Sequence, residues 1–530
     1  MKKNILFRLS KLGLYSISIV LLSSGCSKLG PDFNAVEQLN TPKEQATKNE
    51  QIAQWWKIFD DPLLDSLVTK TYAQNLDLKS AGLRILQARA VLGISQGLTF
   101  AQQQTLSGSA AAIRSNGNSY GAVGVNFDVG WEMDVWGKYA RGIESSEADL
   151  YASIASYSDI MVSVIAEVAR NYINYRTAQE RIAYARRNIV IQERVTRMTE
   201  IQFNSGNVSE LDMQQARSQL YTTRSSLPSL ELSMITTRNA MALLMGIDLK
   251  EMETILNSSK KHSDTLNKYI NQEKNYVQIQ EEDKASISIE FVPTAKFDPY
   301  YKVDAQLLKN RPDIKVAEYL AHSNSAKIGT AMAQLYPSFV LFGNIGINTN
   351  SASGSWSSAS DSIGVGIGPS FSWNIFAYDR IKNQVRLQDA IFEESLVNYN
   401  KKVLQAATEV SDAIHGYRLT NEQQEENKKA VEATVRAFNI SMTQYNDGLV
   451  SYQRLLSTVE SLTRNQDRYA QIKGSLATYI VSLYKALGGG WQMSQGEAYL
   501  SNETAKKMQE RTDWGDYLDK NMTRLPKGMW

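Results

Sequence analysis

The chain has 530 residues, 43% of them hydrophobic, and a formal net charge of +2. This length is ample for a large core, and the balanced charge argues against a nucleic-acid binder. Ten prolines are few for this length, which favours long uninterrupted elements. No stretch after residue 25 approaches 18 consecutive apolar residues, so we expect no transmembrane helix in the mature chain.

Residues 1–25 have the pattern of a signal peptide. Lys2, Lys3 and Arg8 precede the apolar run LGLYSISIVLLSS, which is the length of a signal-peptide core. The run ends in SSGC, which resembles a bacterial lipobox and predicts a covalent lipid on Cys26, the only cysteine. Ser27 favours the outer membrane in lipoproteins of this kind. The alternative is an ordinary signal peptide followed by an incidental cysteine.

The first half of the mature chain is predicted to read helix, strand, strand, long helix, helix, at residues 62–100, 103–114, 120–136, 138–204 and 209–245. In the second strand the odd positions from Val123 to Val135 are apolar, and the even positions are Gly, Asn, Asp or Glu. This period of two places every apolar side chain on one face. Ser209 and Asp212 have the spacing of a capping box, which predicts a helix start just after a turn at Gly206.

The long helix carries an apolar stripe that steps by four and three residues, as in a coiled-coil seam. The stripe consists of Leu150, Ile154, Tyr157, Met161, Ile165, Val168, Tyr172, Tyr175, Ala178, Ile182, Ala185 and Ile189. At 1.5 Å per residue the helix is about 100 Å long and needs partners along its whole length.

The same order of elements recurs in the second half, at residues 304–335, 337–350, 362–376, 378–446 and 451–487. Gly206 corresponds to Gly448, and Gly246 to Gly488, at one offset of 242 residues. A constant offset indicates an internal duplication. Within RPDI, Pro312 suits the first turn of a helix, where its missing N–H is no loss.

Four alternating strands that face lipid must close into a barrel, and four strands are too few to close alone. We therefore expect chains to share one barrel, with the glycine-rich face lining a water-filled lumen. An aromatic girdle at the membrane boundary is predicted from Trp131, Trp136, Trp373 and Phe376. The alternative is a soluble β-sandwich, whose strands also alternate.

Five ordered motifs resemble outer-membrane-factor lipoproteins, the TolC-like, NodT-type channels of tripartite efflux systems. They are GPDF (30–33), WWKIFDDPLLDSLV (55–68), NLDLKSA (75–81), NRPDI (310–314) and GNVSELDMQQARSQL (206–220). The resemblance implies a mainly α fold with a β-barrel portion, completed as a homotrimer of twelve strands and twelve tunnel helices. It also implies a periplasmic adaptor, a proton-driven inner-membrane pump and no enzymatic activity.

The resemblance divides the chain into a signal peptide (1–25), a lipidated extension (26–61), two repeats (62–249 and 304–490), an equatorial insertion (250–303) and an equatorial tail (491–530). The polar segments outside the repeats would form a belt around the tunnel. Gly206 and Gly448 would mark hairpins at the tunnel's far tips. Candidates for the periplasmic gate there are Tyr445, Tyr452, Gln453, Arg454, Leu456, Ser457, Glu460, Glu210 and Asp212.

The family's acidic gate ring is missing, since its two aspartate positions fall on Arg454 and Ser457, and we expect an Arg454–Asp212 latch instead. Three widely spaced histidines argue against a metal site, and no cofactor is expected beyond the lipid on Cys26. The predicted function is a passive exit duct for efflux. The alternatives are the channel of a type I protein secretion system and a lipid-anchored periplasmic coiled-coil scaffold without a pore.

Overall fold

The computed structural model describes residues 28–34, 52–115, 117–258, 289–295, 310–352, 355, 356, 358, 362–377 and 379–526. The signal peptide, Cys26 and most of the 250–303 insertion lie outside these residues. The chain forms two compact units: Met1–Leu39, Arg84–Ala155 and Asp313–Lys402 make the first, and Asn40–Leu83, Ser156–Pro312 and Val403–Trp530 the second.

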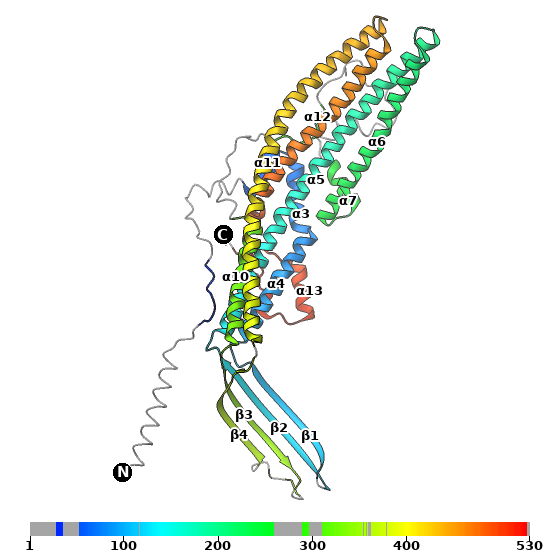
Figure 1. Cartoon of the computed structure of the whole chain (residues 1–530). Coiled ribbons are helices and arrows are strands. Elements are labelled where there is room, and N and C mark those ends of the chain that lie inside the picture. Colours follow the sequence, from blue (N-terminus) through cyan, green and yellow to red (C-terminus); the bar gives the residue numbers. More distant parts are fainter. Residues whose placement is uncertain are drawn as a thin grey trace. The chain divides into compact units, whose positions relative to one another are not determined.

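The first unit holds one antiparallel sheet with the strand order β1-β2-β3-β4 (Figure 1). The strands are β1 (Gln103–Ser115), β2 (Asn118–Met133), β3 (Ser338–Asn350) and β4 (Ile363–Ser372). All four predicted strands are therefore present. The central pair, β2 and β3, runs from Ala122↔Asn350 to Met133↔Phe339.

The predicted strand ends at residues 136 and 376 were wrong. β2 stops at Met133 because the Asp134 carboxylate turns back and accepts hydrogen bonds from the backbone N–H groups of Tyr139 and Ala140. Those two amides belong to the first turn of the next helix, which a carboxylate stabilises. β4 stops at Ser372, where the chain turns.

The first unit also contains α10 (Pro312–Ala333) and the beginnings of α5 (Lys138–Asn204) and α11 (Arg380–Asn446). Pro312 is the first residue of α10, as the RPDI motif predicted. The predicted beginning of that helix at residue 304 lies outside the described residues.

The second unit is built on two helix hairpins, α5 with α6 (Glu210–Met245) and α11 with α12 (Tyr452–Ala486) (Figure 1). α5 and α11 have 67 residues each. The turns fall at Gly206 and Gly448, with φ of +74° and +70°, where a side chain would be strained. Because the two halves match in helix length and turn geometry, the duplication is present in the backbone as well.

Shorter elements of the second unit are η1 (Trp55–Phe59), α3 (Pro62–Gln74), α7 (Leu249–Asn257), η4 (Trp491–Ser494), α13 (Asn502–Arg511) and η5 (Gly515–Leu518). All twelve residues of the predicted stripe on α5 are buried. Within α5 lies the one described 18-residue window apolar enough to cross a membrane, and 67% of that window is buried inside the protein. The stripe is therefore packed core.

The single helix predicted for residues 62–100 was wrong. Asn75 interrupts it and separates α3 from α4 (Leu76–Gly97). The Asn75 backbone has ψ of 131°, which is not helical, and its side chain accepts from Leu78 N at 2.8 Å as an N-cap. Its amide donates to Leu244 O on α6 at 2.7 Å, so the break also fixes α6 to this junction.

The segments outside the repeats are not purely polar, which corrects our expectation. Trp55 and Trp56 in the N-terminal extension are each only 2% exposed, and Trp491 in the C-terminal tail is also buried. The Trp55 ring stacks on Tyr484 of α12 with centroids 5.4 Å apart. Burial of rings of this size contributes strongly to stability, so these segments complete the core of the second unit.

Candidate functional site

The sheet has one apolar face that the described residues leave uncovered. Along the register, Phe127 on β2 faces Ile345 on β3, and Ile345 faces Val365 on β4. Exposed side chains of this face are Val123, Val125, Phe127, Trp131, Leu341, Ile345, Ile347, Ile363, Val365, Ile367 and Phe371. An apolar surface this continuous marks a protein or membrane contact. A β-sandwich would cover it with a second sheet, and the described residues form one sheet only.

The opposite face of the sheet is lined mainly by asparagine, glycine and other polar residues, with Phe342 as an apolar exception. Asn126, Asn344 and Asn348 lie across the glycines of the neighbouring strands, where an added Cβ would collide with their amide oxygens. Asn348 Nδ2 donates to Asn126 Oδ1 at 2.8 Å. This arrangement keeps the side chains here polar and close to the sheet, which suits a water-filled lumen.

The predicted girdle residues lie where the sheet joins the helices. The indole N–H groups of Trp131, Trp136 and Trp373 donate to the backbone carbonyls of Thr99, Pro337 and Leu335 at 3.1, 2.8 and 2.9 Å. Phe376 is 78% exposed. Indoles with one apolar and one hydrogen-bonded end suit a membrane–water boundary. The girdle itself stays a prediction.

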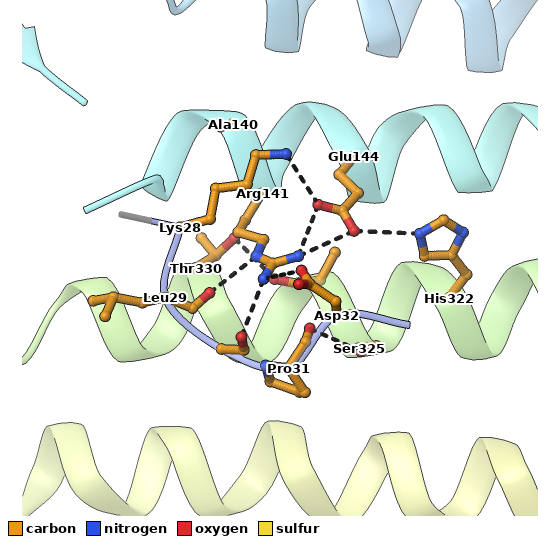
Figure 2. A network of polar contacts seen from close by, with 12 residues as sticks. Lys28, Leu29, Pro31, Asp32, Ala140, Arg141, Glu144, His322, Ser325 and Thr330 are labelled. Atoms are coloured by element: carbon orange, nitrogen blue, oxygen red, sulfur yellow. Dashed lines mark hydrogen bonds and ion pairs between the residues drawn. The ribbon is translucent and has the colours of Figure 1, made fainter. Parts of the chain in front are cut away.

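A buried arginine holds the N-terminal segment against the first unit (Figure 2). Arg141 on α5 is 1% exposed and donates to the carbonyls of Leu29 and Gly30 and, at 2.7 Å, to the Asp32 carboxylate. It also pairs with Glu144 at 2.9 Å. One guanidinium thus binds the GPDF motif through the Gly30 carbonyl and the Asp32 carboxylate, and its five donors allow it to bind Leu29 and Glu144 as well.

His322 on α10 completes this network. Its Nε2 lies 3.3 Å from Glu144 Oε1, and its ring stacks on Phe33 with centroids 5.0 Å apart. The histidine therefore packs the N-terminal segment. Among the described residues no three His, Cys, Asp or Glu side chains could hold a metal ion together, and His262 lies outside them.

The ends of the two hairpins share an apolar cluster. Its buried members come from α5, α6, α11 and α12 and are Val195, Ala216, Phe438, Tyr445, Tyr452, Leu455, Leu456, Val459 and Leu462. The Tyr445 and Tyr452 rings meet edge to face at 6.1 Å, and the Tyr445 hydroxyl lies 3.2 Å from Thr199 Oγ1. The four helices are thereby joined within one chain.

The gate candidates divide into two groups by exposure. Tyr445, Tyr452 and Leu456 are buried in the cluster, so they support the hairpins rather than offer a surface. Exposed or half-exposed candidates, which are free to face a lumen or a neighbour, are Glu210, Asp212, Gln453, Arg454, Ser457 and Glu460. Gate function for this second group stays a prediction.

Within the described chain Asp212 and Arg454 form no ion pair. The Asp212 carboxylate instead accepts from Ser209 N at 3.0 Å, and Ser209 Oγ accepts from Asp212 N, so the predicted capping box is confirmed. A latch between these two residues would therefore have to join neighbouring chains.

Charge reversal in Asp212→Arg is expected to raise the open probability of the channel, because it would place two cations at such a latch. Single-channel recording in planar bilayers measures this. Ser209→Ala is the matched control: it removes the cap, costing about 1 kcal/mol, and leaves the carboxylate in place. Equal open probability in wild type and Asp212→Arg would eliminate the latch.

Buried and half-buried tyrosines of the second unit have raised pKa values. Burial raises the pKa of Tyr72 to about 12, with the Glu497 charge as a smaller cause. Burial also raises the pKa of Tyr172 and of Tyr452. The neutral phenol is thus favoured in the folded chain.

The contribution of these tyrosines to stability is therefore expected to be fully present below pH 10 and to be lost as pH rises above it, because the unfolded chain then releases phenolic protons that the folded chain retains. Absorbance of tyrosinate and helical circular dichroism, followed together through an alkaline titration, measure this. Buried tyrosines should ionise only as helix is lost. Complete ionisation near pH 10 with the helix intact would contradict the expectation.

A buried ion pair joins α5 to α12 and was missed by the sequence analysis. Glu180 is 0% exposed and accepts from Lys473 Nζ at 2.8 Å. Its second oxygen accepts from the backbone N–H groups of Phe291 and Val292 at 3.1 and 3.2 Å. Residues 291 and 292 of the 250–303 insertion are thus bound to the helices by the Glu180 carboxylate, beside the apolar packing of Ile289 and Phe291 on Tyr184 and Ala470.

A sheet with an exposed apolar face and a polar face, joined to long paired helices, defines a membrane channel protein of mixed α and β structure. The family model described as outer membrane efflux protein matches residues 67–247 and 305–489. The chain belongs to this family. It is an efflux protein of the outer membrane.

Related proteins align with nearly the whole length of the chain. Nodulation protein T of Rhizobium leguminosarum bv. trifolii is 26% identical over 486 residues, covering 89% of this chain and 96% of the relative. The cation efflux system protein CusC of Escherichia coli O6:H1 is 25% identical over 495 residues, covering 90% and 99%. The solved outer-membrane channel OprN matches with a TM-score of 0.73 and 26% identity, covering 88% of this chain and 99% of that one.

Proposed function

We propose that the chain is the exit duct of a tripartite efflux pump, which passively conducts small molecules expelled by an inner-membrane transporter through a periplasmic adaptor. The family and the cation efflux relative support this assignment. The duct itself carries out no chemistry and uses no cofactor. A lipid on Cys26 would anchor it.

The observation that carries the proposal is the open, two-faced sheet. In the described residues β1 and β4 each pair with one neighbour only, so each leaves an edge of unpaired N–H and C=O groups. Such edges cannot persist in hydrocarbon, where each unsatisfied group costs several kcal/mol. Copies of the chain must therefore complete the barrel. Three copies supply three times four strands, enough to enclose a water-filled lumen.

Reconstitution of the purified protein tests this directly. We expect trimers in detergent by light scattering and discrete conductance steps in planar bilayers. A monomer that is soluble without detergent would overturn the proposal. A trimer without conductance would support the lipid-anchored scaffold instead.

The cargo class is tested in cells. A deletion strain is expected to accumulate small toxic compounds and to regain resistance on complementation. Loss of a secreted protein from the medium, with unchanged drug sensitivity, would favour type I secretion. Adaptor and pump partners are expected to co-purify after crosslinking.

A further inference from the structure

The polar face of the sheet carries two carboxylates, and their surroundings differ. Register places Asp128 and Glu132 of β2 on this face, together with Asn126 and the glycines opposite it. β3 and β4 contain no charged residue. Arg114, the basic residue of β1, pairs with Ser119 and so belongs to the other face. The charge of the lining on the described strands is thus set by two side chains.

Glu132 is neutralised locally. Its carboxylate accepts from Lys138 Nζ at 3.0 Å and from the Tyr139 hydroxyl at 2.8 Å, both on the first turn of α5. A paired carboxylate contributes little field at a distance, because the ammonium cancels its charge. Glu132 therefore links the end of β2 to the first turn of α5.

Asp128 has no such partner among the described residues. Its cross-strand neighbours are Thr105 on β1 and Asn344 on β3, and no Lys, Arg or His nitrogen of the described chain lies within 4.0 Å of its carboxylate. Asn344 itself lies across Gly366 of the next strand. Asp128 is half-exposed, and its neighbours on this face, Thr105, Asn344 and the Phe342 that pairs with Gly130, are uncharged, so no described cation cancels its charge.

We propose that Asp128 makes the barrel lumen selective for cations, so that positively charged solutes are favoured over anions. The proposal rests on the proposed function, because only in the proposed trimer would the three copies of Asp128 form a ring of carboxylates. Rings of Asp or Glu side chains are a common basis of cation selectivity in pores. Since the Debye length is about 8 Å at physiological salt and shrinks as salt rises, the selectivity must weaken at high salt.

The test is the reversal potential of single channels in a KCl gradient, recorded for wild type, Asp128→Asn, Asp128→Lys and Glu510→Gln. Wild type is expected to favour K⁺, and more strongly in dilute than in concentrated salt. Asp128→Asn should bring the permeability ratio close to 1, and Asp128→Lys should reverse it. Glu510→Gln removes an exposed carboxylate from α13 and should behave as wild type.

Asn is nearly isosteric with Asp and already lines this face, so the first variant is expected to assemble. Thr105→Lys provides an independent check, because it places an ammonium opposite Asp128 and should also bring the ratio close to 1. A conducting wild type whose reversal potential is unchanged in Asp128→Asn and Thr105→Lys overturns this inference alone. Absence of channels in wild type overturns the proposed function, and this inference with it.

Discussion

Replacing Glu180 by Ala is expected to lower the free energy of unfolding by about 3–5 kcal/mol, because the change leaves the Lys473 ammonium buried without a counter-charge. The same change leaves the amides of Phe291 and Val292 without an acceptor. Urea-induced unfolding of the purified protein in detergent, followed by circular dichroism, measures the loss. The midpoint should fall markedly.

Two further variants isolate the cause. Glu290→Ala removes a neighbouring carboxylate that is exposed, and its effect should stay within about 0.5 kcal/mol. Glu180→Ala with Lys473→Met removes both charges, and stability should recover in part, since two well-packed neutral side chains often match a buried pair. Equal losses in Glu180→Ala and Glu290→Ala would refute the role given to Glu180.

Arg141→Met is expected to cost about 3 kcal/mol and to release the N-terminal segment from the first unit. Glu144 then loses its closest cation, and the carbonyls of Leu29 and Gly30 lose their donor. Thermal unfolding measures the stability, and limited proteolysis of the segment reports its release.

Lys28→Ala is the matched control for Arg141→Met. Lys28 reaches Glu144 at 3.6 Å but is 53% exposed, and such pairs contribute about 0–1 kcal/mol. A protected N-terminal segment in Arg141→Met would show that other contacts, such as Phe33 on His322, suffice to hold it.

Strict periodicity made β2, β4 and the long helix α5 predictable from the sequence, whereas β1 and β3 alternate less cleanly. Alternation from Val123 to Val135 identified β2, and the stripe on α5 identified residues that are all buried. Backbone geometry fixes which residues of a strand or a helix share one face. The buried residues of each element therefore recur at a regular spacing that can be seen in the sequence. The end of β2 and the break at Asn75 were missed because single side-chain caps decide them.

The buried charges could not be predicted. In a helical pattern Arg141, Glu180 and Lys473 are expected to be solvated, and each has a partner more than a hundred residues away in the chain, although Arg141 also pairs with nearby Glu144. For Trp131, Trp136 and Trp373, no sequence pattern indicated the backbone carbonyls to which their indoles donate. Long-range polar contacts leave no periodic signal.

The shared core at the hairpin ends limits how this protein can open. Nine buried side chains from all four helices form one cluster, so spreading the two hairpins of a single chain would expose apolar surface at each of them. Fully burying one large apolar side chain is worth about 1.5–3 kcal/mol. In the trimeric duct proposed above, dilation would therefore be cheaper if each chain tilted as one rigid body, and the hinge is then to be sought where the proposed copies meet.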